Sequence, residues 1–284
     1  MHPFSLKLRD RIVEITRPQI MGIVNVTPDS FYAGSRTADA DSIARRVEKM
    51  VADGADWIDI GAYSSRPGAT EVSVGEEINR LRTGMKYLRE VAPDIPVSVD
   101  TFRADVARMA VEELGVDAVN DISGGTLDDA MFSTVARLDV PYVLMHMRGT
   151  PSTMQSCTGY SDVTADVITE LQRKLADLRG LGVSDIIIDP GFGFAKTLEQ
   201  NYELMHHLDA FSLLGCPLLV GVSRKSMIYR LTGKSPEESL AGTVALGALA
   251  IERGAAFLRV HDVAAAVDTR AVVEATLRGN MNHS

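Results

Sequence analysis

Polar side chains recur at the ends of short apolar runs in this chain, and their types suit the binding of a polar heterocycle. Asp100, Asn120 and Asp189 offer hydrogen-bond acceptors, to which the Asn120 amide adds a donor. Lys225 and Arg259 lie near the ends of two further runs and bring donors, or a cationic surface that can stack on a ring. We expect these five residues to bind a flat ring with alternating N–H and carbonyl edges.

A second set of residues could hold an anion and a metal ion. Arg66, Arg259 and His261, together with loop N–H groups, provide the donors that a phosphate needs. Asn25 offers a neutral oxygen, which could complete the shell of a Mg²⁺ ion whose other ligands are pyrophosphate oxygens and water. The sequence has no Cys/His cluster with zinc spacing, no Walker loop and no G-x-S-x-G turn, so zinc binding, ATP hydrolysis and serine acyl transfer lack their residues.

Some polar residues have a simpler explanation. An Asp just past a strand often caps the following helix or fixes a turn, and we favour that structural role for Asp59 and Asp121. His206 and His207 fall in a helical stretch away from the other candidates, so we expect them at the surface. All eight apolar runs end in polar residues, which is more than helix caps and turns alone require. We therefore interpret the remaining strand-end residues as parts of one site.

Eight apolar runs, each followed by a polar or Gly-rich loop and an amphipathic stretch, must position these residues. The runs are Ile20–Asn25, Trp57–Ile60, Val97–Val99, Ala118–Asn120, Tyr142–Met145, Ile186–Ile188, Leu218–Gly221 and Phe257–Val260. Short runs without alternation are typical of a parallel sheet covered on both faces. The repetition predicts an α/β fold, a single (β/α)8 TIM barrel, whose active site would lie at the carboxyl ends of the strands. An open doubly wound sheet is the alternative, but Asn25-Val26-Thr27-Pro28 is not the Gly-rich turn that such a sheet normally carries.

The pattern also predicts helix starts and the extent of the domain. Ser73 with Glu76 and Thr197 with Gln200 each have the spacing of a capping box. We expect one barrel domain over residues 1–284, with barrel strands at approximately 20–260.

Composition limits the class of protein. The formal net charge is −9, and no basic run is longer than Arg45-Arg46, which disfavours binding to nucleic acid or to an anionic membrane. Cys157 and Cys216 have no metal or disulfide-framework spacing, so we expect two reduced thiols. The first ten residues contain no signal-peptide apolar region, and no apolar run approaches a bilayer span. We predict a cytoplasmic protein.

Seven segments of the chain resemble the signature motifs of the dihydropteroate synthases, in family order. They are Gly22–Phe31, Asp59–Gly61 with Ser65–Gly68, Ser98–Thr101, Asn120–Gly125, Asp189–Phe194, Gly221–Ser226 and Arg259–Asp262. The resemblance covers nearly the whole chain, and it implies a pterin-binding TIM barrel. It also implies a reaction in which 6-hydroxymethyl-7,8-dihydropterin pyrophosphate condenses with p-aminobenzoate to give 7,8-dihydropteroate and pyrophosphate, with Mg²⁺ as cofactor.

The resemblance also implies roles for individual residues. The pterin would be bound by Asp100, Asn120, Met145, Asp189, Gly221, Lys225 and Arg259. The pyrophosphate would be bound by Asn25, Arg66, Arg259 and His261, with Asn25 also on the metal. The p-aminobenzoate would lie near Ser65, Arg66, Pro67, Phe194, Lys225 and Ser226. Asp100, Lys225, Arg259 and His261 would be the catalytic residues. Family members are usually homodimers, so a homodimer is expected.

One loop departs from the family pattern. The commoner form reads Gly-Gly-Glu-Ser-Thr-Arg-Pro-Gly, whereas this chain has Tyr63 in place of the Glu and Ser65 in place of the Thr. We expect the Tyr63 ring to pack within the protein rather than to lie exposed at a subunit contact. The departure leaves the reaction class unchanged.

Two other functions are alternatives. The methyltetrahydrofolate-binding barrel of a corrinoid methyltransferase also uses Asn and Asp at its strand ends. It has no pyrophosphate to hold, however, and would not need the pairing of Ser223–Lys225 with Arg259–His261. A barrel that binds without turnover is the second alternative, and it would be expected to lack Asn25 or Lys225.

Overall fold

The eight expected strands form one parallel sheet that curls into a barrel. The computed structural model describes residues 3–26, 36–63 and 72–281. The strands are β3 (Gln19–Asn25), β4 (Trp57–Gly61), β5 (Val97–Asp100), β6 (Ala118–Asp121), β7 (Tyr142–Met145), β8 (Ile186–Asp189), β9 (Leu219–Val220) and β10 (Phe257–Val260). Their order in the sheet is β8-β7-β6-β5-β4-β3-β10-β9, and a parallel bridge between Ile188 and Leu218 joins its two ends. The prediction of a (β/α)8 barrel is therefore confirmed, and the open sheet is excluded.

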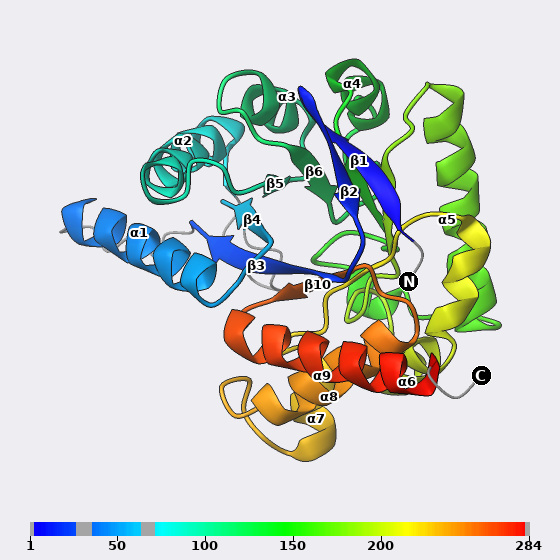
Figure 1. The fold of residues 1–284 in the computed structure, drawn as a ribbon. Coiled ribbons are helices and arrows are strands. Elements are labelled where there is room, and N and C mark those ends of the chain that lie inside the picture. Colours follow the sequence, from blue (N-terminus) through cyan, green and yellow to red (C-terminus); the bar gives the residue numbers. More distant parts are fainter. Residues whose placement is uncertain (1–2, 27–35, 64–71, 282–284) are drawn as a thin grey trace.

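Helices follow the strands and surround them (Figure 1). They are α1 (Arg36–Ala52), α2 (Val74–Val91), α3 (Ala104–Glu112), α4 (Met131–Leu138), α5 (Val163–Gly180), α6 (Leu198–His206), α7 (Ser226–Thr232), α8 (Leu240–Glu252) and α9 (Val263–Met281), with short 3₁₀ turns at Met154–Ser156 and Leu208–Leu214. The main hydrophobic core lies between the strands and these helices. None of the helices in the described part of the chain is long and apolar enough to cross a membrane.

A hairpin that we did not expect precedes the barrel. Strand β1 (Phe4–Leu8) pairs antiparallel with β2 (Arg11–Ile15). Leu6, Leu8 and Ile15 are buried in a second apolar cluster, together with Trp57 and Phe257, the first residues of β4 and β10. The hairpin therefore closes the amino-terminal end of the barrel, opposite the strand ends that carry the polar residues.

The two expected capping boxes differ. Thr197 accepts a hydrogen bond from the Gln200 amide, and the Gln200 side chain accepts one from the Thr197 amide, so this box is complete. Ser73 caps the Glu76 amide at 3.2 Å, but the Glu76 carboxylate pairs with Arg80 one turn later. Cys157 and Cys216 are free thiols, as expected, and His206 and His207 are exposed.

Candidate active site

Arg259 connects carboxylates from two neighbouring strands in the barrel interior. Its Nε donates to Asp59 Oδ2 at 2.6 Å and its Nη2 donates to Asp100 Oδ2 at 2.7 Å. The Asn120 amide donates to the same Asp59 oxygen at 3.2 Å. The structure thus gathers Asp100, Asn120 and Arg259, three of the expected site residues, around one fully buried carboxylate.

The structural role that we favoured for Asp59 is wrong. Asp59 is fully buried, and it accepts hydrogen bonds from the Ser98 hydroxyl, Asn120 and Arg259 rather than from the next helix. It lies in the middle of β4, so its side chain points into the barrel beside Ser98 of β5. Asp59 therefore holds the guanidinium and the amide of two candidate residues in place.

The structural role of Asp121 is confirmed. Its carboxylate accepts hydrogen bonds from the Ser123 amide and hydroxyl, the Gly125 amide and the Tyr142 hydroxyl, all between 2.7 and 2.8 Å. Burial raises the pKa of Asp121, and these donors oppose the rise. With its acceptor capacity used locally, Asp121 fixes the turn after β6.

Asp100 and Arg259 form an ion pair whose two members respond differently to burial. Burial raises the pKa of Asp100 to about 7, helped by Asp59, while Arg259 opposes the rise. Burial alone would lower the pKa of Arg259, but Asp59 and Asp100 outweigh it, so the pKa of Arg259 lies above its ordinary value. The site therefore carries a permanent cation beside a carboxyl group that can change charge near neutral pH.

Lys225 contacts the loop that follows β8. Its ammonium donates to the Phe192 carbonyl oxygen at 2.6 Å and lies 4.8 Å from the centre of the Phe194 ring. A Cβ added at Gly221 would lie 3.8 Å from both Lys225 Nζ and Arg259 Cβ, so the bare backbone of Gly221 faces the Lys225 ammonium and the base of the Arg259 side chain. Burial lowers the pKa of Lys225 to about 8, and the nearby Asp189 opposes this.

Asp189 is the last residue of β8 and is almost fully buried. Its Oδ1 accepts a hydrogen bond from the Gly191 amide at 2.8 Å, and only 5% of its surface is exposed. Burial raises its pKa, opposed first by Lys225. Asp189 and Asp100 therefore both influence the pKa of Lys225, so two strand ends and the start of α7 bring three predicted residues into electrostatic contact.

His261 is neutral at pH 7 and is oriented by a serine. Burial lowers its pKa to about 4, helped by the charges of Arg259 and Arg46. The Ser223 oxygen accepts the His261 amide at 3.2 Å and lies 3.0 Å from His261 Nδ1. Arg46, on α1, was not identified from the sequence because nothing in a helical stretch marked it as facing the strand ends.

Apolar side chains line the mouth of the barrel beside these polar groups. Met145, at the end of β7, is buried with Ile122 and Met147, and Phe194 packs against this cluster. Ser226 is half-buried at the first position of α7, directly after Lys225. These positions provide an apolar surface next to donors and acceptors, as a flat aromatic ligand requires.

The remaining predicted residues divide into one described position and three that are not. Asn25 ends β3, opposite Gly61 of β4, and is half-buried. Ser65, Arg66 and Pro67 lie outside the described residues. Within the described ranges, no group of three or more His, Cys, Asp or Glu side chains is arranged to hold a metal ion.

Tyr63 packs against its neighbours, as expected. Its ring meets Phe102 edge-on with centroids 4.9 Å apart, and the Arg103 guanidinium lies 5.4 Å from the Tyr63 ring centre. Arg103 is held in turn by the buried carboxylate of Glu77 at 2.7 Å. The aromatic residue that replaces an acidic one in the family pattern is therefore part of a packed group.

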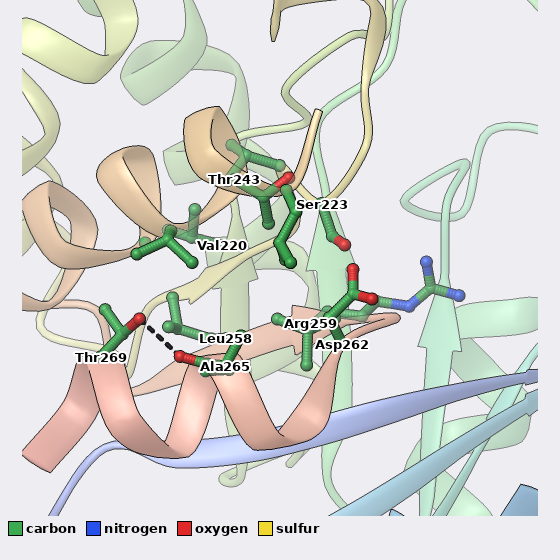
Figure 2. A pocket seen from close by; sticks show the side chains of 14 residues that line it. Val220, Ser223, Thr243, Leu258, Arg259, Asp262, Ala265 and Thr269 are labelled. Carbon is green, nitrogen blue, oxygen red and sulfur yellow. Dashed lines mark hydrogen bonds between the residues drawn. The ribbon is translucent and has the colours of Figure 1, made fainter. Parts of the chain in front are cut away.

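A cavity lies outside the barrel wall, between β9, β10 and helices α8 and α9 (Figure 2). Val220, Leu258 and Ala265 line it, and Thr269 closes one side by donating to the Ala265 carbonyl oxygen. Figure 2 shows the Arg259 guanidinium pointing away from these side chains. Most of its lining is aliphatic, although Ser223, Arg259 and Asp262 border it on the side of the strand ends.

Comparisons with known proteins identify the family of the chain. Residues 21–261 match the family model described as pterin binding enzyme. The chain is 43% identical to a dihydropteroate synthase of Synechocystis sp. over 92% of this chain and 91% of that protein. The solved structure of the Xanthomonas albilineans dihydropteroate synthase with 4-aminobenzoic acid is similar, with a TM-score of 0.87 and 40% identity over 96% of this chain and 98% of that one. The same enzyme in complex with 7,8-dihydropteroate gives a TM-score of 0.85 and 38% identity, over the same shares of the two chains.

Proposed function

The chain belongs to the dihydropteroate synthases within the family of pterin-binding enzymes, and we propose that the strand-end cluster around Arg259 and Lys225 is its active site. The chain is a transferase of folate biosynthesis. It joins 6-hydroxymethyl-7,8-dihydropterin pyrophosphate to p-aminobenzoate and releases pyrophosphate. The corrinoid methyltransferase alternative is not favoured, because the relatives are dihydropteroate synthases. The grouping of Asp100, Asn120, Asp189 and Lys225 inside one barrel mouth carries the proposal.

The pterin would enter the polar interior with its ring edge against Asp100, Asn120 and Asp189. The two carboxylates accept hydrogen bonds from ring N–H and amino groups, whereas the Asn120 amide, oriented by Asp59, both donates and accepts. Arg259 is fixed by Asp59 and Asp100, so its guanidinium plane is pre-organised to stack on the ring. Such a site costs little reorganisation when the substrate binds.

The pyrophosphate would lie on the side of Asn25, Arg66 and His261. Neutral His261 donates one hydrogen bond, and its Nδ1 contact with the Ser223 hydroxyl leaves Nε2 to carry the proton toward the anion. Asn25 supplies one neutral oxygen, which fits Mg²⁺ because this ion keeps several waters and takes its remaining ligands from substrate phosphates. When bound, Mg²⁺ neutralises charge on the leaving pyrophosphate.

The p-aminobenzoate would lie between Phe194 and the start of α7, with Ser65, Arg66 and Pro67 on its other side. As the carbon–oxygen bond to pyrophosphate breaks, positive charge develops on the pterin carbon, and Asp100 and Asp189 stabilise it. The electron pair of the broken bond leaves with pyrophosphate, and the amine nitrogen then forms the new carbon–nitrogen bond and gives up its proton to solvent. Lys225, with a pKa of about 8, is mostly protonated at pH 7 and donates to the pterin edge beside the incoming amine.

We extend the proposal to assembly and location. A homodimer through helices away from the mouth is supported by exposed apolar residues on the last three helices, namely Leu231, Leu240, Leu249, Val272 and Leu277. The free thiols of Cys157 and Cys216 support a cytoplasmic location.

Pyrophosphate release tests the proposed function directly. We expect release only when the pterin pyrophosphate, p-aminobenzoate and Mg²⁺ are all present, with dihydropteroate formed in equal amount. Asp189→Asn should reduce the rate strongly, while the exposed Asp209→Asn should leave it unchanged. Release of pyrophosphate that does not depend on p-aminobenzoate would contradict the assignment.

A further inference from the structure

Lys196 is a buried lysine that the proposed substrate contacts do not include. It binds the loop after β8, in which Phe192 and Phe194 contact Lys225. Lys196 is only 4% exposed, and its ammonium donates to the Gly191 carbonyl oxygen at 2.9 Å and to the Phe194 carbonyl oxygen at 3.1 Å. Its third contact is His146 Nδ1 at 3.2 Å. All three of its donors are therefore used, and two of them hold the loop that follows β8.

The histidine on the other side of Lys196 is itself held. His146 is 2% exposed, and its Nε2 lies 3.0 Å from Glu170 Oε2 on α5. Because Nδ1 accepts from the lysine, Nε2 carries the hydrogen and donates it to Glu170. Burial lowers the pKa of His146 to about 4, which agrees with a neutral ring. Arg148 Nε holds Glu170 at 2.9 Å, so a chain of contacts runs from α5 through the end of β7 to the loop.

The loop is also pressed against the backbone of the same histidine. Gly191 has φ +73°, and a Cβ placed there would lie 2.0 Å from the His146 carbonyl oxygen, so only glycine allows this approach. The loop then presents the Phe192 carbonyl oxygen to Lys225 and places the Phe194 ring beside the same ammonium. Its conformation therefore sets the position of Lys225.

We propose that Lys196, held by His146 and Glu170, is a positioning residue that fixes the loop after β8 and thereby places Phe194 and Lys225 for the attack of p-aminobenzoate. The assignment rests on the proposed function for its catalytic consequence. An ammonium is costly to bury, and it is retained here with three acceptors drawn from the end of β7 and from both ends of the loop. Lys225 also donates to the pterin edge, but Asp100, Asn120 and Arg259 belong to other strands, so pterin binding should depend on Lys196 less than the attack of p-aminobenzoate does.

Lys196→Met tests the proposal by separating the two substrates. We expect kcat/KM for p-aminobenzoate to fall tenfold or more, while the Kd for the pterin pyrophosphate changes less than threefold. Hydrogen exchange in residues 190–196 should accelerate, with the other strand ends unchanged. Lys234→Met is the control, because Lys234 is exposed, and it should keep wild-type kinetics and exchange. Wild-type kcat/KM together with unchanged exchange in Lys196→Met would overturn the proposal.

A pair of variants at His146 decides the question if Lys196→Met does not fold. Asn places an oxygen near the Nδ1 position and can still accept from Lys196, whereas Gln places its amide near Nε2 and keeps only the Glu170 contact. We expect His146→Asn to stay within threefold of wild type and His146→Gln to lose p-aminobenzoate kcat/KM tenfold or more. Equal behaviour of the two variants would overturn the role of Lys196. If the wild-type protein made no dihydropteroate, the proposed function would fail, and the exchange measurement would still test the anchoring of the loop.

Discussion

Lys225 contacts several parts of the proposed site, and its removal should therefore lower activity strongly. Its ammonium is bound by the Phe192 carbonyl oxygen, faces Phe194 and interacts with Asp189. We expect Lys225→Ala to lower kcat/KM by about a hundredfold or more, since loss of a buried charged hydrogen bond is worth about 3 kcal/mol. Steady-state kinetics with both substrates measures this.

The control for this variant is a lysine nine residues further along the chain. Lys234 is exposed, so Lys234→Ala should keep wild-type kinetics. Thermal melting should show that Lys225→Ala stays folded. A Lys225→Ala enzyme within a few-fold of wild type, with the same melting curve, would remove Lys225 from the site.

Two aspartates show what sequence could predict about the site and what it could not. Asp59 lies within one apolar run and Asp121 directly follows another, and we expected a structural role in capping or turns for both. Asp121 follows that expectation, because Ser123 and Gly125 provide local donors two and four residues away. Asp59 does not, because its partners Asn120 and Arg259 are 61 and 200 residues away. Local spacing carries no information about such distant partners, and the roles of the other strand-end residues were expected from the resemblance to the family motifs.

The role of Ser65 is a prediction from the sequence alone, because this residue lies outside the described residues. The resemblance assigns it to p-aminobenzoate, and the family usually has Thr there. One methyl group in a small pocket is worth about 1 kcal/mol at most. We expect Ser65→Thr to leave kcat nearly unchanged and to lower KM for p-aminobenzoate slightly, with sulfonamide inhibition constants moving the same way. Complete loss of activity would show that this loop is built differently from the family's.

At the scale of elements, the barrel strands were predictable and the hairpin that closes the barrel was missed. Strand β3 begins one residue before its predicted start, and β9 is shorter than predicted, with Leu218 present only as a bridge. The hairpin did have a signal, because apolar residues alternate through Phe4–Leu8, as strands with one buried face require.

The hairpin should stabilise the protein without contributing to catalysis. Leu6 is 2% exposed beneath the barrel, far from the carboxyl ends of the strands. We expect Leu6→Ala to lower the free energy of unfolding by about 2–5 kcal/mol through loss of burial and a remaining cavity. Below the melting transition, kcat should be unchanged. Ile12→Ala on the same hairpin is the control, because Ile12 is 76% exposed and should cost little. If Leu6→Ala lowered kcat while the protein was still fully folded, the hairpin would contribute to catalysis and the prediction would be wrong.

At the scale of the whole molecule, the two ends of the barrel differ in the side chains that they bury. The amino-terminal end is filled by apolar side chains such as Trp57 and Phe257. The carboxyl end holds buried and half-buried ionisable groups, including Asp100, Lys196 and His146, whose pKa values are displaced by loss of solvation. The proposed catalytic end is therefore the part of the fold whose stability should respond most to pH.

His146 should make this response visible in mild acid. Its pKa is about 4 in the folded protein against an ordinary 6.5, so the unfolded chain takes up a proton first as pH falls. The stabilisation from keeping His146 neutral is complete above pH 6.5 and is lost progressively down to about pH 4. Its size is up to about 3 kcal/mol, at 1.36 kcal/mol per pKa unit. The stabilisation that ionised Glu170 contributes is lost only at lower pH, down to about pH 2, because hydrogen bonds from His146 and Arg148 hold its pKa near 2.

Urea unfolding of His146→Asn between pH 5 and pH 8 tests this assignment. Asn has no proton to gain in this range, so the variant should lose less stability on acidification than the wild type does. Its absolute stability at pH 8 should be lower because the contact with Glu170 is gone. The difference between the two proteins should therefore narrow as pH falls from 7 to 5. His206→Asn is the control, because His206 is exposed and its replacement should leave the wild-type pH dependence intact. Parallel stability curves for the wild type and His146→Asn across this range would show that His146 does not titrate between the folded and unfolded states.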